Sequence, residues 1–201
     1  MRILCKMPAR LILGLAKADR LNIMAAMISR PNPGRLFVFC VLCLLAAVSP
    51  AAAQSVERLG DFQAWSAFRF TENGNRACYM ASQPVKHEGK YTRRGDIYAL
   101  VTHRPAEKLR DEVSFIIGYK FKPESNLEVA IGSEKFSLFT KEDGAWTHSS
   151  DDDQRLVQSM IKGQTMVVKG VSWRGTNTTD TYSLSGFTKA YQRISATCAV
   201  N

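Results

Sequence analysis

The sequence has few of the residues from which metal centres and catalytic sites are usually built. It contains three histidines, at positions 87, 103 and 148, and none stands in the HxH or HExxH spacing of a metal site. The nearest match to the GxSxG motif of serine hydrolases, residues 170–175, has one residue too many, and no histidine follows it. We therefore expect no metal, no cofactor and no catalytic residue.

Long hydrophobic runs are also scarce. The apolar run Leu36–Val48 has thirteen residues, whereas a helix that spans a bilayer needs about 17–25. Arg30 and Arg35 precede the run, and a Ser-Pro pair and three alanines follow it. This order is typical of a secretory signal peptide. We predict cleavage after Ala53, no membrane span in the mature chain, and a location in the periplasm or at the outer, extracellular surface.

Most of the excess positive charge belongs to this leader. The sequence carries a net charge of +9, but seven of its 27 basic residues and one of its 18 acidic residues precede Gln54, which leaves +3 for residues 54–201. That small excess is not typical of a protein that binds nucleic acid, and we expect no such partner. Because the charged start is long for a signal peptide, Met24 and Met27 compete with Met1 as the true start codon.

Only two cysteines remain after the leader, Cys78 and Cys198. An even number of cysteines in an exported chain indicates a disulfide bond. The alternative is two separately buried thiols. A bond between them would close a loop of about 120 residues, for which the loss of chain entropy in the unfolded state contributes about 4–5 kcal/mol of stability.

Short segments of alternating apolar and polar residues dominate residues 54–201, and no linker or repeat divides them, so we expect a single domain. Alternation at period 2, with turn residues between the segments, predicts strands. We expect a few loose residues after Gln54 and then strands over 62–70, 77–83, 96–103, 112–121, 127–131, 135–139, 165–173 and 179–184. Turns are expected at 72–75, at Gly132-Ser133 and at 174–177.

Two segments have the period of a helix instead. In residues 151–162, the apolar side chains fall on one helical face after the acidic run Asp151–Asp153, which favours a helix N-terminus. Calcium binding is the alternative role of that acidic run, but its spacing does not fit an EF-hand. A second helix over 187–196 would bring Cys198 back onto the domain. Strands with two short helices predict a mainly β fold, an antiparallel β-sandwich, with a mixed α+β sheet as the alternative.

Residues 111–119, DEVSFIIGY, resemble a strand of the invasion-associated locus B family of exported bacterial proteins. Further matches follow in the same order at 136–140, 145–146, 166–170, 174–176 and 180–187, and the resemblance covers about residues 60–199. It implies an exported, compact, β-rich domain. The family offers no established catalytic residue to transfer to this sequence, and its name refers to the entry of some bacteria into host cells.

These observations together predict an exported, non-enzymatic envelope or binding protein with an unidentified envelope or host-surface partner. Exposed arginine and tryptophan are effective binding anchors, so the candidate binding surface is Arg94, Asp96, Trp173, Arg174 and Thr176. One alternative is a surface adhesin or invasion factor that presents Arg94-Gly95-Asp96 to a receptor, although the same tripeptide also suits a tight turn. Another is an envelope-polymer hydrolase that uses carboxylates such as Asp96, Glu112 or Asp180.

Overall fold

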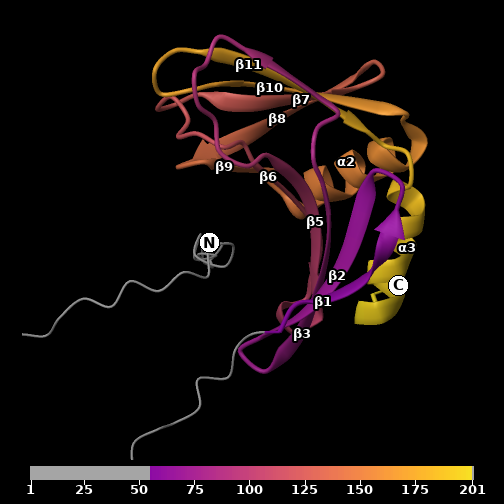
Figure 1. Ribbon diagram of the computed structural model, residues 1–201. Helices are drawn as coiled ribbons and strands as arrows, with labels where there is room; N and C mark the ends of the chain where they lie inside the picture. The colour runs from indigo at the N-terminus through magenta and orange to yellow at the C-terminus, as the bar shows by residue number, and fades with distance from the viewer. Residues whose placement is uncertain (1–54, 201) are drawn as a thin grey trace, which may run out of the picture. The chain divides into compact units, whose positions relative to one another are not determined.

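The computed structural model describes residues 55–200, and the predicted signal peptide, its cleavage site and the candidate start codons lie outside this range. The elements follow one another along the chain as shown in Figure 1. They are β1 (Glu57–Phe62), β2 (Trp65–Glu72), β3 (Asn75–Ser82), β4 (Lys86–Gly89), β5 (Tyr98–Arg104), the 3₁₀ turn η1 (Pro105–Glu107), β6 (Leu109–Ile116), β7 (Asn126–Ile131), β8 (Glu134–Lys141), β9 (Gly144–Trp146), α2 (Ser150–Lys162), β10 (Thr165–Val171), β11 (Asn177–Ser183) and α3 (Phe187–Cys198).

The strands pair into one eleven-stranded sheet in the order β1-β2-β3-β5-β6-β9-β8-β7-β10-β11-β4. Its two parts are joined through β9, whose three residues pair with β6 on one side and with β8 on the other. In Figure 1 the strands β7, β8, β10 and β11 lie across the top, while β2, β3 and β5 run downward. The mainly β prediction is confirmed. The strands form one open antiparallel sheet, however, and not the two separate sheets of a sandwich.

Contacts across the core explain why the sequence pattern looks like that of a sandwich. The rings of Phe115 on β6 and Tyr182 on β11 meet edge to face with their centroids 6.3 Å apart. The Trp65 indole N–H on β2 donates to the carbonyl of Ser183 at 3.0 Å, and its ring packs edge-on against Phe187 of α3. Strands that are far apart in the sheet order therefore face one another across one buried apolar cluster.

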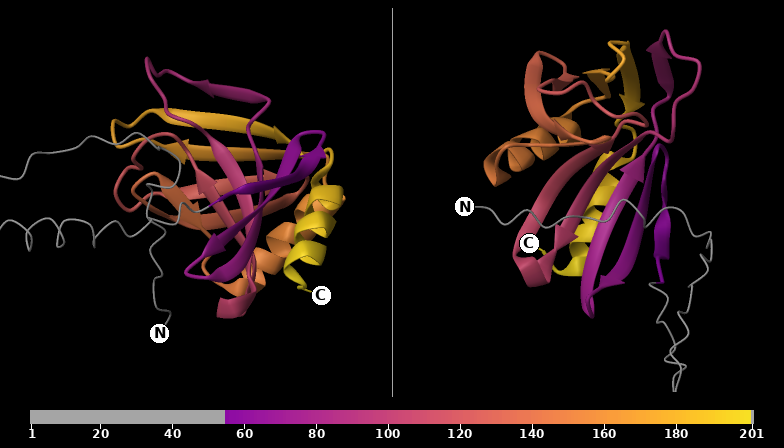
Figure 2. Two further views of the ribbon diagram at one scale, coloured as in Figure 1. Left: turned by 60° about the horizontal axis from the view of Figure 1, so that its bottom comes forward. Right: turned by 90° about the vertical axis from the view of Figure 1, so that its left-hand side faces the viewer.

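The two helices lie against this sheet, and both were predicted from their period. α3 contacts β1, β2, β3 and β5, α2 contacts β6 and β8, and the helices also touch each other (Figure 2). The apolar faces are buried, with Leu156 and Met160 on α2 and with Phe187 and Ile194 on α3. The 3.6-residue period of apolar residues thus predicted both helices and the helix faces that pack against the sheet.

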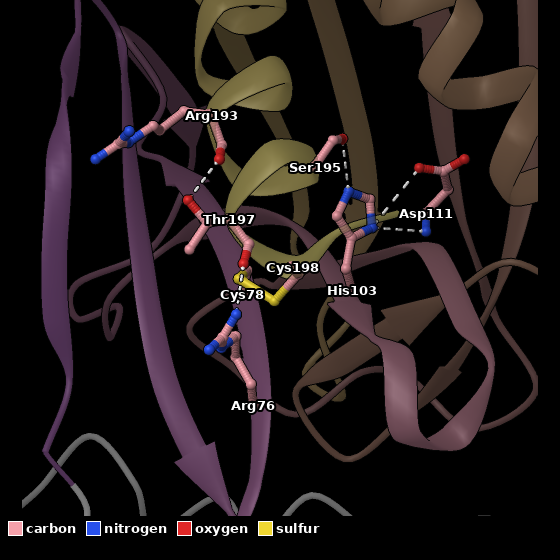
Figure 3. The surroundings of a disulfide bond; sticks show 8 residues. All are labelled: Arg76, Cys78, His103, Asp111, Arg193, Ser195, Thr197 and Cys198. Carbon is pink, nitrogen blue, oxygen red and sulfur yellow. Dashed lines mark hydrogen bonds and ion pairs between the residues drawn. A yellow bond between two sulfur atoms is a disulfide. The ribbon is translucent and has the colours of Figure 1, made fainter. Parts of the chain in front are cut away.

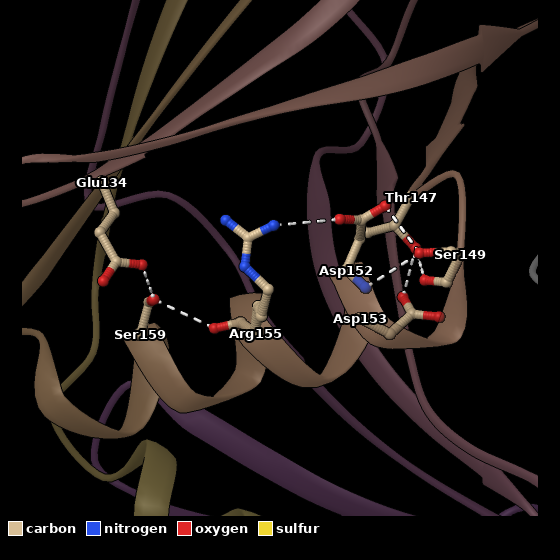
Figure 4. A network of polar contacts seen from close by, with 7 residues as sticks. All are labelled: Glu134, Thr147, Ser149, Asp152, Asp153, Arg155 and Ser159. Carbon is tan, nitrogen blue, oxygen red and sulfur yellow. Dashed lines mark hydrogen bonds and ion pairs between the residues drawn. The ribbon is translucent and has the colours of Figure 1, made fainter.

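The start of α2 differs in detail from the prediction (Figure 4). Ser149 is the N-cap, and its hydroxyl accepts the backbone N–H of Asp152 at 3.1 Å. Asp153 is buried, and its carboxylate accepts a hydrogen bond from the backbone N–H of Val113 at 2.9 Å and from the Thr147 hydroxyl at 2.7 Å. One member of the acidic run therefore fastens α2 to β6, while negative charge near the helix N-terminus adds favourable electrostatics.

Several strand assignments differ from the sequence pattern. The expected strand over 112–121 begins earlier, at Leu109, and ends at Ile116. The expected strand over 62–70 is split by a turn at Gln63, whose φ is +58°, and β1 begins at Glu57, where we expected loose chain. Strand β4 was missed because all four of its residues are exposed, so that it shows no alternation. Strand β9 was missed because it has only three residues.

Candidate functional site

The predicted disulfide between Cys78 and Cys198 is present and joins β3 to the last residue of α3 (Figure 3). On the neighbouring strand, His103 lies opposite Cys78 and is completely buried. The disulfide thus fixes the end of α3 to the sheet next to the buried imidazole ring of His103.

Buried His103 lies in a polar network that the sequence did not reveal (Figure 3). Its Nε2 is 3.1 Å from the Ser195 hydroxyl on α3, and its Nδ1 is 3.8 Å from the Asp111 carboxylate. The Tyr191 hydroxyl donates to the same carboxylate at 2.7 Å. These are the residue types of a serine-hydrolase triad, brought together from three segments with no recognisable motif.

The hydrogen bonds to His103 do not suit catalysis. Nδ1 accepts the backbone N–H of Asp111 at 3.1 Å, so the neutral ring carries its proton on Nε2 and donates it to Ser195. A triad needs the opposite tautomer, in which Nε2 takes the serine proton. Burial lowers the pKa of His103 to about 4, because desolvation of the charged ring outweighs the attraction of Asp111, and Arg110 adds repulsion. We assign the network a structural role between β5, β6 and α3.

The side chain of Arg94, one of the predicted surface residues, is buried. It is 4% exposed and forms a bidentate ion pair with Asp180 at 2.7 and 2.5 Å, while its Nε donates to the carbonyl of Ile117 at 2.8 Å. The rings of Tyr91 and Tyr119 lie 5.5 and 5.1 Å from the guanidinium carbon. Burial acts to lower the pKa of Arg94, but the hydrogen bonds and charge of Asp180 outweigh it and raise that pKa. Arg94 is therefore not available as an exposed anchor.

The Arg94-Gly95-Asp96 tripeptide is an irregular segment that packs against residues 117–118, just after β6. Gly95 donates its N–H to the carbonyl of Gly118 at 2.8 Å. Gly118 has a φ of +75°, and a Cβ there would lie 2.5 Å from the Gly95 carbonyl oxygen, so only glycine fits this close approach. Asp96 is exposed, but the arginine that an adhesive tripeptide must present points inward. The predicted tight turn is absent as well, because residues 93–97 form an irregular segment before β5.

The carboxylates considered for hydrolysis are held in different environments. Asp180 is neutralised by Arg94, and Glu112 on β6 accepts a hydrogen bond from Arg104 at 2.8 Å. Burial raises the pKa of Glu112, and the ion pair with Arg104 opposes part of that rise. Two of the three candidate carboxylates thus stabilise arginines inside the fold.

The other predicted surface residues gather at the turn between β10 and β11. Trp173 is 58% exposed, and the Arg174 guanidinium lies over its ring at 4.8 Å from the centroid. Thr176 donates its backbone N–H to the Ser172 hydroxyl at 3.1 Å, which shapes the turn. Trp173 in turn donates its backbone N–H to the carbonyl of Lys120 at 2.9 Å.

That last contact places Trp173 next to a surface cavity of about 210 Å³. The backbone of residues 120–122 runs between two turns, because Lys122 bonds to the carbonyl of Val171 at 3.0 Å and Phe121 to the carbonyl of Glu142 at 2.8 Å. The polar and aromatic side chains that line the cavity include Lys120, Phe121, Lys122, Glu124, Lys141 and Glu142. Two separate segments, residues 120–124 and 140–142, line it, so no local motif could have predicted it.

Charges of both signs line this cavity. Lys120 pairs with Glu142 at 2.9 Å. Among residues 55–200, Lys122, Lys141 and Glu124 take part in no ion pair.

Within the same range, no helix is long and apolar enough to cross a membrane, and no three His, Cys, Asp or Glu side chains gather in a metal-binding arrangement.

The family model for the invasion associated locus B (IalB) protein matches residues 65–195. The chain belongs to the IalB family. Among solved structures, this IalB protein is similar to the crystal structure of invasion associated protein B from Bartonella henselae, with a TM-score of 0.49 and 12% sequence identity over 69% of this chain and 95% of that chain. No curated protein matches the sequence. The matched range runs from β2 into α3 and includes the cavity and the Trp173 turn.

Proposed function

We propose that this IalB-family chain is an exported, non-enzymatic binding protein that acts in the periplasm or at the cell surface. The observation that carries the proposal is the exposed Trp173–Arg174 pair beside an open cavity. Tryptophan and arginine dominate the energetics of binding surfaces. Among residues 55–200, Trp173 is the one aromatic residue in the set of exposed large hydrophobic side chains.

Export is supported by two independent features. The apolar run Leu36–Val48, with arginines before it and small residues after it, has the order of a signal peptide. The disulfide between Cys78 and Cys198 is a bond that persists in oxidising compartments and is rare in the cytosol. Fractionation of cells should recover the cleaved, oxidised chain outside the cytoplasm. Uncleaved chain in the cytoplasm with both thiols reduced would overturn this part of the proposal.

A non-enzymatic role is supported by the state of the groups that could do chemistry. His103 holds its Nε2 proton against Ser195, and Asp180 and Glu112 are paired with arginines. None of these groups faces the cavity, which is lined by other residues. The surface that remains open offers hydrogen bonds and an aromatic ring, which are the means of binding.

Affinity capture from an envelope extract tests the proposal. The exported chain is immobilised as wild type, as Trp173→Ala, as Arg174→Ala and as the control Lys135→Ala. Lys135 is an exposed cation on β8. Its register partner on β7 is Ala130, which in turn pairs with Val167 on β10. Val167 precedes Trp173 by six residues, so Lys135 lies about 20 Å from Trp173 along the strand direction.

We expect one envelope component to be held by the wild type and the control and lost from Trp173→Ala. Capture of nothing by the wild type, or equal capture by all four chains, would contradict the proposal.

A further inference from the structure

The cavity beside Trp173 offers hydrogen-bond donors and acceptors in nearly equal number. Lys122 and Lys141 present ammonium groups, and Glu124 presents a carboxylate, none of them in an ion pair among the described residues. The Lys120–Glu142 pair adds one more charge of each sign. A ligand for this cavity must therefore both donate and accept hydrogen bonds.

This balance of charge decides between classes of ligand. Three lysines and two glutamates give the cavity a net charge of only +1, and a polyanion attracted by the lysines would also meet the two carboxylates, which oppose its binding. An apolar peptide segment would find little to cover, because Phe121 is only 7% exposed. A sugar hydroxyl donates one hydrogen bond and accepts two, so a saccharide can use the lysines and the glutamates together.

The neighbouring Trp173 supplies an aromatic ring against which the apolar face of a sugar ring can pack. One face of a pyranose carries C–H groups, and these pack against an aromatic ring. Trp173 is exposed, and its backbone is hydrogen-bonded to that of Lys120 in the cavity wall, so the two backbones lie one strand spacing, about 5 Å, apart. Arg174 over the indole adds donors beside the ring.

The size of the cavity indicates how much of a ligand it holds. Pockets that enclose a drug-sized molecule measure about 300–1,000 Å³, whereas this one measures about 210 Å³ and lies on the surface. It therefore accommodates one unit of a longer molecule. We infer that the cavity and Trp173 together bind a neutral or N-acetylated saccharide chain, with one ring in the cavity and the next against the indole. This inference rests on the proposed function and names its ligand class.

An array of immobilised oligosaccharides tests the inference with the intact exported chain. The array carries neutral and N-acetylated chains, with sulfated oligosaccharides and poly-L-glutamate as polyanionic comparators. We expect a neutral or N-acetylated chain to bind, with binding reduced about tenfold or more in Trp173→Ala and in Lys141→Ala. The control Lys135→Ala lies on the same strand and face as Lys141 but about 20 Å away, and it should bind as the wild type does.

Two further readouts separate the ligand classes. Glu124→Gln should weaken saccharide binding, whereas it would strengthen binding of a polyanion. The bound saccharide should also protect the exposed Trp173 from quenching by acrylamide. Trp173→Phe should lose this effect, because of the two remaining tryptophans Trp65 is buried, and Trp146 is half-buried, stacks on Phe139 and does not line the cavity. All of these side chains are on the surface, and unchanged melting temperatures would show that the variants fold.

The inference is overturned if no saccharide on the array binds, if the Trp173 and Lys141 variants keep wild-type binding, or if polyanions bind better and Glu124→Gln improves them. Its failure can be told from failure of the proposed function. Affinity capture of a protein that depends on Trp173 would keep the binding role and reject the saccharide. Capture of nothing would reject the binding role itself.

Discussion

Acidification should destabilise this protein through one residue, His103. The ring is enclosed by Asp111 and Arg110 from β6, by Ser195 and Tyr191 from α3, and by the disulfide on β3. Both ring nitrogens are already used by the neutral form, so a second proton on Nδ1 would lose the hydrogen bond from the Asp111 backbone.

The magnitude follows from the pKa in the two states. Burial lowers the pKa of His103 from 6.5 to about 4 in the folded protein. Between those pH values the unfolded chain binds a proton that the folded chain does not, so the contribution to stability is complete above about pH 6.5 and is lost as the pH falls toward 4. The loss is about 2 kcal/mol at pH 5 and about 3 kcal/mol once both states are protonated.

Urea unfolding at pH 7.5 and pH 5, with the disulfide intact, measures this loss. His103→Asn keeps an acceptor for the Asp111 N–H but does not titrate. We expect it to be less stable than the wild type at pH 7.5, while its drop in stability between the two pH values is smaller by about 2 kcal/mol. Groups such as Glu112, whose raised pKa acts in the opposite direction, are common to both proteins and cancel in the comparison.

His87→Asn, at an exposed residue of β4, is the control and should keep the wild-type drop. Equal drops in the wild type and His103→Asn would refute the reasoning. So would an NMR titration of the wild type that places the pKa of His103 near 6.5, a measurement that does not depend on the variant folding.

Three further predictions concern stability, each measured by urea unfolding. Cys198→Ser should cost about 4–5 kcal/mol, because the disulfide spans 120 residues; a loss below about 1 kcal/mol would show that the bond adds little. Arg94→Ala should cost about 3–5 kcal/mol by leaving Asp180 charged, buried and unpaired, and the paired change Arg94→Met with Asp180→Leu should recover most of it; no recovery would argue against the ion-pair explanation. Gly186→Ala should cost more than Gly74→Ala, since both have positive φ but only at Gly186 would the new Cβ meet backbone, 1.8 Å from a carbonyl oxygen; equal costs would show that φ alone decides.

Features determined by short stretches of sequence were predictable. The hairpin at Gly132-Ser133 follows from a glycine with φ of +58° between two alternating segments. Helices α2 and α3 follow from their apolar period, and the disulfide from the count of cysteines that follow the predicted leader. The residues that determine the hairpin and the helices lie close together in the sequence, and the disulfide was predictable because only two cysteines follow the predicted leader.

Features that depend on distant partners were not predictable. Arg94 and Asp180 are 86 residues apart, and only the folded chain shows that an arginine in a polar loop is buried by that pair. The network of His103 likewise joins three segments, and the cavity beside Trp173 joins two. The pairing of β9 with both β6 and β8, which makes one sheet of the expected sandwich, was not predictable either. The alternation of side chains reports which face is buried and not which strands pair.

The most direct test of the binding role is a photocrosslink at the surface itself. A benzophenone amino acid placed at position 174 in living cells should, on irradiation, join the chain to one envelope component, and the same amino acid at position 135 should not. The account predicts an adduct specific to position 174 that disappears when Lys141→Ala is added. Irradiated cells with no adduct at 174, or with the same adducts at both positions, would contradict it.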